Sequence, residues 1–253
     1  MRVIGFAGKG GTGKTTLAAL FLKSLLENGK KEILVIDSDP NECLPGVLGV
    51  KEYLRLSDMV KKYQGKTMNP EQFSEDFATM LVVNEQEGFD ILVMGRGESE
   101  GCYCIINHLL RSSFEKNILT GAYKYVLMDC EAGIEHISRK TSTFIDDLVI
   151  VTDASKMGLE TIKRIKDVSA EVESKVKNFY VVGNKVQSEE VSAEIEKAAD
   201  ELGMKYLGSI PYDALIEEFN FREKNLLEIP KESRAYKEAK KMLNSITPAN
   251  KKV

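Results

Sequence analysis

The sequence lacks any apolar run of the roughly 20 residues that a membrane-spanning helix needs. It also lacks the opening of a secretory signal peptide, because a charged residue and a glycine-rich loop follow the first methionine almost at once. Four cysteines in 253 residues are too few for a disulfide scaffold. We therefore expect a cytoplasmic protein whose thiols are free.

An excess of either charge is missing as well. The chain has 35 Lys and Arg against 39 Asp and Glu, a formal net charge of −4, with both signs well mixed. A nucleic-acid-binding protein usually carries a basic patch. The lysine-rich stretch 231–253 has few large apolar residues and so matches an amphipathic membrane anchor poorly. We expect neither a nucleic acid nor a membrane as a partner.

What the chain does contain is a regular alternation of apolar runs and helix-like stretches. The runs are mostly continuous in Val, Ile and Leu, which is typical of strands buried on both faces of a parallel sheet. We expect strands at 3–7, 32–37, 79–83, 91–94, 125–129, 148–152, 179–182 and 206–210. Helices are expected at 15–28, 156–175 and 189–202, with a helical excursion over the surface at about 51–76.

This alternation predicts a doubly wound α/β fold, with a mostly parallel sheet of about seven or eight strands flanked by helices. The sequence has no internal repeat and no low-complexity linker. We therefore expect 1–253 to form a single domain.

Residues 8–15 carry the most informative motif. They match G-x-x-x-x-G-K-[ST] and lie between an expected strand and an expected helix, as a phosphate-binding loop does. Lys14 is expected to reach the β- and γ-phosphates, and the Thr15 hydroxyl to bind Mg²⁺. The nucleotide-binding residues expected here are Gly8, Lys9, Gly10, Gly11, Thr12, Gly13, Lys14, Thr15 and Thr16.

Acidic residues end two further expected strands. Asp37 and Asp39 close the run 32–37, and Asp129 ends the run 125–129. Because ligands of open α/β sheets bind at the carboxyl ends of the strands, these carboxylates should face the phosphate-binding loop. Together with Thr15 they are the residues expected near Mg²⁺, with Asp129 holding the ion through a water. No N-K-x-D guanine-reading motif is present, which favours ATP over GTP.

Cys102 and Cys104 form a second informative motif. Residues two apart in extended backbone project to the same side, so both sulfurs can bind one soft metal ion. A closed site needs about four ligands, and a symmetric dimer could supply the other two. Two alternatives stay open: the thiols pack as small apolar side chains, or His108 joins them as a ligand. Cys43 and Cys130 are expected to have packing roles.

The second lysine of the octet, Lys9, resembles the deviant signature of the MinD, ParA, ArsA and nitrogenase-reductase class of ATPases. In that class this lysine reaches across a dimer interface to the partner's nucleotide. The resemblance implies catalytic roles for Lys9 and Lys14, and for Asp39 as the residue that orients the attacking water. It also implies that the Gly133 backbone approaches the γ-phosphate, and that adenine is contacted around Asn184, Lys185 and Pro211.

The deviant loop, the Asp39-Pro40 pair, the C-Y-C motif and the segment E-A-G-I-E-H-I-S-R at 131–139 occur together and in this order. That set resembles the CooC family of nickel-insertion ATPases, which mature carbon monoxide dehydrogenase; a sister protein serves acetyl-CoA synthase. The resemblance implies an ATP-hydrolysing homodimer that binds Ni²⁺, or Zn²⁺, through Cys102 and Cys104 of both chains and acts on a client nickel enzyme.

Two other interpretations remain open. A nitrogenase-reductase-like protein would hold an Fe–S cluster at the dimer interface, although His136 stands where that class has its second cysteine. A MinD- or ParA-like positioning ATPase would need a membrane anchor or a basic surface, and the sequence offers neither.

Overall fold

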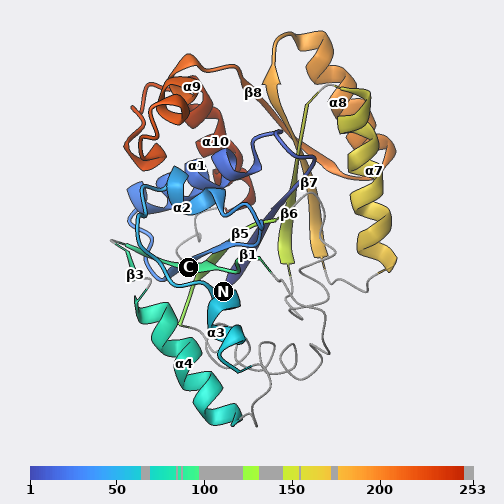
Figure 1. Ribbon diagram of the computed structural model, residues 1–253. Coiled ribbons are helices and arrows are strands. Elements are labelled where there is room, and N and C mark those ends of the chain that lie inside the picture. The colour runs from blue at the N-terminus through green and yellow to red at the C-terminus, as the bar shows by residue number, and fades with distance from the viewer. Residues whose placement is uncertain are drawn as a thin grey trace, which may run out of the picture.

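The computed structural model describes residues 1–63, 69–83, 85–86, 88–96, 122–130, 145–153, 155–171 and 176–247. Its centre is an eight-stranded sheet in the order β3-β4-β2-β5-β1-β6-β7-β8 (Figure 1). The strands are β1 Arg2–Ala7, β2 Ile33–Asp37, β3 Glu85–Gln86, β4 Phe89–Val93, β5 Tyr125–Asp129, β6 Ile145–Thr152, β7 Val176–Val186 and β8 Lys205–Pro211. All neighbours pair in parallel except β3 and β4. The doubly wound fold expected from the sequence is confirmed.

The sheet is buried on both faces, and successive residues of each strand alternate between them. In β1, Val3 and Ala7 belong to one apolar cluster, whereas Ile4 and Phe6 belong to the other. A strand that is covered on both sides needs apolar residues at every position, which is why its sequence is a continuous rather than an alternating run.

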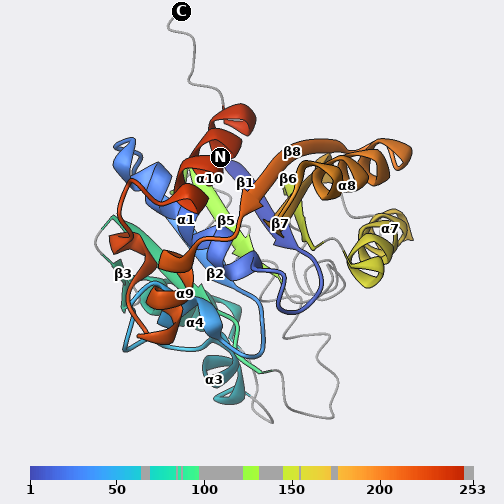
Figure 2. The ribbon, with the colours of Figure 1, turned by 90° about the horizontal axis from the view of Figure 1, so that it is seen from above.

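Helices cover both faces (Figures 1 and 2). The cluster around Ile4 and Phe6 is completed by α1 Lys14–Glu27, α2 Cys43–Val47, α9 Ala214–Phe221, the 3₁₀ turn Leu226–Glu228 and α10 Arg234–Ile246. The cluster around Val3 and Ala7 is completed by α3 Leu56–Lys61, α4 Pro70–Val83, α7 Lys156–Glu171 and α8 Glu189–Glu201. No helix of the described ranges is long and apolar enough to cross a membrane.

The expected strand at 79–83 is wrong, because these residues form the end of α4. Phe73, Phe77, Met80 and Leu81 are all buried. Their spacing of four, three and one is helical, and it extends the pattern back beyond the short apolar run. The segment around 51–76 is likewise no excursion over the surface, since α3 and α4 contribute buried side chains to the core.

The lysine-rich C-terminal stretch contains α10, and one side of this helix is apolar. Tyr236, Ala239, Met242, Leu243 and Ile246 are buried in the same cluster as the apolar side chains of α1. The lysines lie on the remaining surface of the helix. The described part of this stretch is therefore a structural helix of the core.

Candidate functional site

The glycine-rich octet forms the tight connection between β1 and α1. Gly8 has a φ of 142°, and a Cβ there would overlap the carbonyl oxygen of Val151 on β6. Gly13 has a φ of 93°, and a Cβ there would overlap the side-chain amide of Asn184. Gly13 also stands at the N-cap of α1 without a side chain to cap it, so the first turn keeps N–H groups that can bind an anion.

The carbonyl oxygen of Lys9 holds this loop together. It accepts hydrogen bonds from the Thr12 hydroxyl at 2.8 Å and from the Lys14 ammonium at 3.3 Å. Lys14 is only 6% exposed. Its ammonium has a single carbonyl as acceptor among the described groups, and a buried positive charge with so few partners favours an incoming anion. The Lys9 side chain is half-buried, and no ion pair joins it to any of the described residues.

Thr15, in the first turn of α1, and Asp129, the last residue of β5, lie side by side. The Thr15 hydroxyl donates to Asp129 Oδ2 at 2.5 Å. Asp129 Oδ1 is buried and has no hydrogen-bond partner among the described groups. Burial, partly offset by the bond from Thr15 and the charge of Lys14, raises the pKa of Asp129 from 3.8 to about 6. A buried carboxylate with a free oxygen beside a hydroxyl fits a Mg²⁺ ion that also takes phosphate oxygens.

Asp37 is fully buried at the end of β2 and accepts two backbone hydrogen bonds, from Asp39 N and Leu44 N, both at 3.0 Å. Burial raises the pKa of Asp37 from 3.8 to about 7, and the nearby charges of Asp129 and Asp39 act in the same direction. The two backbone hydrogen bonds offset only part of this shift. Asp37 thus holds the two ends of the loop 38–44, and its expected place near the metal stays a prediction.

Asp39 lies on that loop and lines the cavity next to the phosphate-binding loop. Its Oδ1 accepts the backbone N–H and the side-chain amide of Asn41, each at 2.9 Å. Asn41 therefore fixes the orientation of the Asp39 carboxylate.

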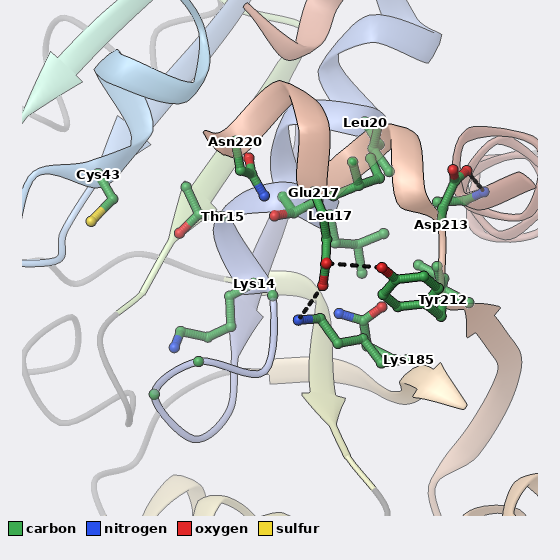
Figure 3. A pocket seen from close by; sticks show the side chains of 18 of the residues that line it. Lys14, Thr15, Leu17, Leu20, Cys43, Lys185, Tyr212, Asp213, Glu217 and Asn220 are labelled. Carbon is green, nitrogen blue, oxygen red and sulfur yellow. Dashed lines mark hydrogen bonds and ion pairs between the residues drawn. The ribbon is translucent and has the colours of Figure 1, made fainter. Parts of the chain in front are cut away.

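A cavity of about 390 Å³ runs from the phosphate-binding loop to β8 and α9 (Figure 3). At the end of the cavity away from the loop, three polar side chains contact one another. The Glu217 carboxylate accepts a hydrogen bond from the Tyr212 hydroxyl at 2.9 Å and lies 3.8 Å from the Lys185 ammonium. Asn184 donates to the carbonyl of Thr12 at 2.7 Å, so it joins β7 to the phosphate-binding loop. The volume is within the usual range for small-molecule sites.

The structure brings most of the expected nucleotide residues to this one cavity. Those that line it are Gly10, Gly11, Gly13, Lys14, Thr15, Thr16, Asp39, Asn184, Lys185 and Pro211. Tyr212, which follows Pro211 in the segment expected to pack against the base, lines it too. Glu217 and Asn220 also line it, and nothing in the sequence indicated them. Gly133, Cys102, Cys104, His108 and His136 lie outside the described residues.

Of the two described cysteines, Cys130 packs in the core as expected, whereas Cys43 is exposed and lines the cavity, so its expected packing role is wrong. Burial and the charges of Asp39, Asp37 and Asp129 raise the pKa of the Cys43 thiol. Burial also raises the pKa of Cys130, which is fully buried. A thiol is a metal ligand as thiolate. No cluster of three or more His, Cys, Asp or Glu able to hold a metal occurs within the described ranges.

Comparison with known proteins agrees with this geometry. Residues 3–226 match the CobQ/CobB/MinD/ParA nucleotide binding domain family. An uncharacterised ATP-binding protein of Methanocaldococcus jannaschii is 37% identical over 251 residues, covering 96% of this chain and 98% of the relative. The carbon monoxide dehydrogenase accessory protein CooC of Rhodospirillum rubrum is 31% identical over 229 residues, covering 85% of each chain.

Among solved structures, the cell division protein MinD of Aquifex aeolicus has the same fold, with a TM-score of 0.73 and 22% identity over 100% of this chain and 99% of that chain. The residues that match the family model, 3–226, include the strands of the sheet, the phosphate-binding loop and nearly all residues that line the cavity. The chain therefore belongs to the CobQ/CobB/MinD/ParA family of P-loop ATPases.

Proposed function

We propose that this ATPase is a maturation factor of the CooC type, which couples ATP hydrolysis and dimerisation to the binding and insertion of nickel into carbon monoxide dehydrogenase or acetyl-CoA synthase. The observation that carries the proposal is the combination of the nucleotide cavity with the Cys102/Cys104 pair in one chain. The similarity to the accessory protein of Rhodospirillum rubrum supports it.

The nucleotide would bind along the cavity, with its phosphates at the loop 8–15 and its base toward Pro211 and Lys185. The buried Lys14 ammonium would neutralise the β- and γ-phosphates. Thr15 and Asp129 would hold Mg²⁺, which supplies charge stabilisation to the transferred phosphate. Asp39, fixed by Asn41, would orient the attacking water.

Two hydrogen bonds support a link between the nucleotide and the cysteine pair. Met94 N donates to the carbonyl of Asp37 at 2.9 Å, and Arg96 Nε donates to the carbonyl of Pro40 at 3.1 Å. The chain that leaves β4 is thereby bonded to the loop that carries Asp39. From Arg96 the sequence reaches Cys102 in six residues. A shift of the loop with nucleotide state would therefore act first on the segment that leads to the cysteines.

Dimerisation would complete the metal site. Each chain offers two thiols, whereas a soft divalent ion takes about four donors. ATP binding would bring two protomers together through Lys9, and the two cysteine pairs would then bind one ion. Four thiolates also suit an Fe–S cluster, so an Fe–S carrier is the second candidate function.

Metal titration of the purified dimer tests the proposal. We expect one Ni²⁺ per two chains, read from thiolate-to-metal absorption, and loss of most binding in Cys102→Ser and in Cys104→Ser. Cys43→Ser is the matched control and should keep the binding, because Cys43 lies in the nucleotide cavity and outside the C-Y-C motif. Unchanged nickel binding in both Cys102→Ser and Cys104→Ser would refute the assignment. A brown protein that contains iron and sulfide would favour the Fe–S carrier instead.

A further inference from the structure

Glu42 has a strained backbone inside the loop that follows β2. Its φ of 51° and ψ of 46° are left-handed, a conformation that costs energy for a residue with a side chain. Such strain persists only where the surroundings enforce it, and it is common in switch regions of proteins. The left-handed backbone therefore indicates that the contacts of Glu42 enforce this conformation, and that the conformation itself has a role in the loop.

The side chain of Glu42 is held by two donors. Its Oε2 accepts from the Tyr53 hydroxyl at 2.9 Å and from Arg55 Nε at 2.7 Å. The glutamate side chain is 15% exposed and the arginine side chain 41% exposed, so the pair is only partly screened by water. The Arg55 guanidinium also lies 5.0 Å from the centre of the Tyr53 ring. Together the three side chains form a compact clamp.

The clamp is anchored on the sheet. The backbone of Arg55 forms a parallel bridge with Val93, the last residue of β4. The carbonyl of Arg55 also accepts from Asp58 N and Met59 N at the start of α3. Arg55 is therefore fixed on its backbone side, and its guanidinium can hold the loop in place.

The other end of the clamp is joined to Asp39. The backbone N–H of Glu42 donates to the carbonyl of Asp39 at 3.0 Å, which closes a turn over 39–42. Asp39, Asn41 and Cys43 line the nucleotide cavity, whereas Glu42 does not. Glu42 thus turns its carboxylate away from the nucleotide and toward Arg55, while its backbone sets the turn that presents Asp39.

We propose that Glu42 is a positioning residue for ATP hydrolysis, and that its carboxylate, clamped by Tyr53 and Arg55, holds the Asp39 side chain beside the phosphate-binding loop. The inference rests on the proposed role of Asp39 in hydrolysis. It assigns Glu42 no contact with nucleotide or water. The nucleotide should therefore bind about as well without the clamp, and the chemical step should be slower.

The test is steady-state ATP hydrolysis by four variants: Glu42→Gly, Glu42→Gln, Arg55→Gln and the double variant Glu42→Gln/Arg55→Gln. Glycine adopts a positive φ without strain, so Glu42→Gly removes the carboxylate and keeps the turn. We expect kcat to fall about tenfold in each variant, because each variant loses a hydrogen bond between charged groups. The KM for MgATP should change by less than about twofold, because no contact with the nucleotide is lost. The double variant should be no worse than either single variant.

Glu238→Gln is the matched control. It removes a carboxylate from the ion pair with Lys241 on α10, and because neither residue lines the cavity kcat should stay unchanged. Tyr53→Phe leaves the loop backbone untouched and should lower kcat by a few-fold, which keeps the proposal testable if Glu42→Gly unfolds. Wild-type kcat in Glu42→Gly or in Glu42→Gln, or fully additive losses in the double variant, would overturn it.

Asp39→Asn separates this inference from the role on which it rests. If Asp39→Asn hydrolyses ATP as fast as the wild type, the role of Asp39 is refuted and the positioning role of Glu42 fails with it. If Asp39→Asn is inactive while the Glu42 variants are fully active, the inference about Glu42 alone is wrong.

Discussion

Lys14 and Asp39 line one cavity, but their replacement should affect ATP turnover in different ways. Lys14→Ala removes a buried positive charge from the phosphate end, so both nucleotide affinity and kcat should fall. Asp39→Asn keeps the shape and the hydrogen bonds from Asn41, while it removes the charge that we propose orients the attacking water. We expect a loss of about 100-fold in kcat with little change in nucleotide affinity.

Isothermal titration with MgADP and steady-state hydrolysis provide the two measurements for this comparison. Glu238→Gln, whose carboxylate pairs with Lys241 and lines no part of the cavity, is the reference variant. An Asp39→Asn protein that turns over ATP at the wild-type rate would remove Asp39 from the mechanism.

The buried Asp129 carboxylate makes the nucleotide-free protein sensitive to pH. Because the pKa of Asp129 is raised to about 6, the folded protein binds a proton that the unfolded chain has already lost. Its ionisation therefore destabilises the fold progressively as pH rises from about 4 to about 6, and the cost is complete above that range.

Asp129→Asn should remove this cost. Without Mg²⁺ and nucleotide, we expect the free energy of unfolding of the variant, relative to the wild type, to increase by on the order of 2 kcal/mol between pH 4.5 and pH 7.5. Urea unfolding at the two pH values measures it. A difference that is the same at both would show that Asp129 carries no raised pKa.

At the scale of residues, the sequence predicted the end of the cavity at the phosphate-binding loop, and at the opposite end it predicted Asn184, Lys185 and Pro211 but not the residues of α9. Lys14, Thr15 and Asp129 could be found because their motifs fix both residue type and position. Glu217 and Asn220 could not, since they enter the cavity only through the packing of α9 beside the end of β8. The left-handed backbone of Glu42 has no sequence signal either, because glutamate rarely adopts it.

Among the helices, α1 and α10 are joined by a partly buried polar contact. Glu27 on α1 accepts from the Tyr236 hydroxyl of α10 at 2.6 Å and lies 3.0 Å from the Lys23 ammonium. Burial disfavours the Glu27 carboxylate, but the bonds from Tyr236 and Lys23 and the charges of Lys23 and Lys231 lower its pKa overall. This contribution to stability is present above the ordinary pKa of 4.5 and is lost as pH falls through the lowered value.

Tyr236→Phe tests the contact between these two helices. It should lower the free energy of unfolding by about 1 kcal/mol at pH 7, because it removes a hydrogen bond to a charged group. The loss should become smaller once acid protonates Glu27. Chemical unfolding at pH 7 and pH 3.5 measures both values, with the exposed Glu238→Gln as the control. An equal loss at both pH values would mean that the Glu27 charge plays no part.

Helix α4 shows where prediction of an element from the sequence failed. Its last residues, Met80 to Val83, are apolar and partly β-branched, so the short run suggested a strand. The spacing of Phe73, Phe77 and Met80 is typical of a helix, but this pattern can be recognised only over a longer stretch of sequence. The parallel strands of the sheet were predicted well because each is a short, continuous apolar run between turns.

On the scale of the whole molecule, the proposed function requires a dimer. Lys9 is half-buried on the phosphate-binding loop and, among the described residues, makes no ion pair. If it crosses to a partner's nucleotide, Lys9→Ala should weaken dimerisation driven by an ATP analogue at least about tenfold, while MgADP binding by the monomer changes little. Sedimentation velocity distinguishes the two effects, and equal dimer fractions for variant and wild type would make Lys9 an ordinary surface lysine.

Coupling between the nucleotide and the metal is the central claim, and nickel affinity in different nucleotide states tests it most directly. Ni²⁺ is titrated into the wild type with MgADP and then with a non-hydrolysable ATP analogue, with Cys102→Ser/Cys104→Ser as the reference. We predict one ion per dimer and a dissociation constant for Ni²⁺ that differs at least about fivefold between the two nucleotide states. The double variant should lose this difference. The same affinity in both states, or one ion bound per monomer, would contradict it.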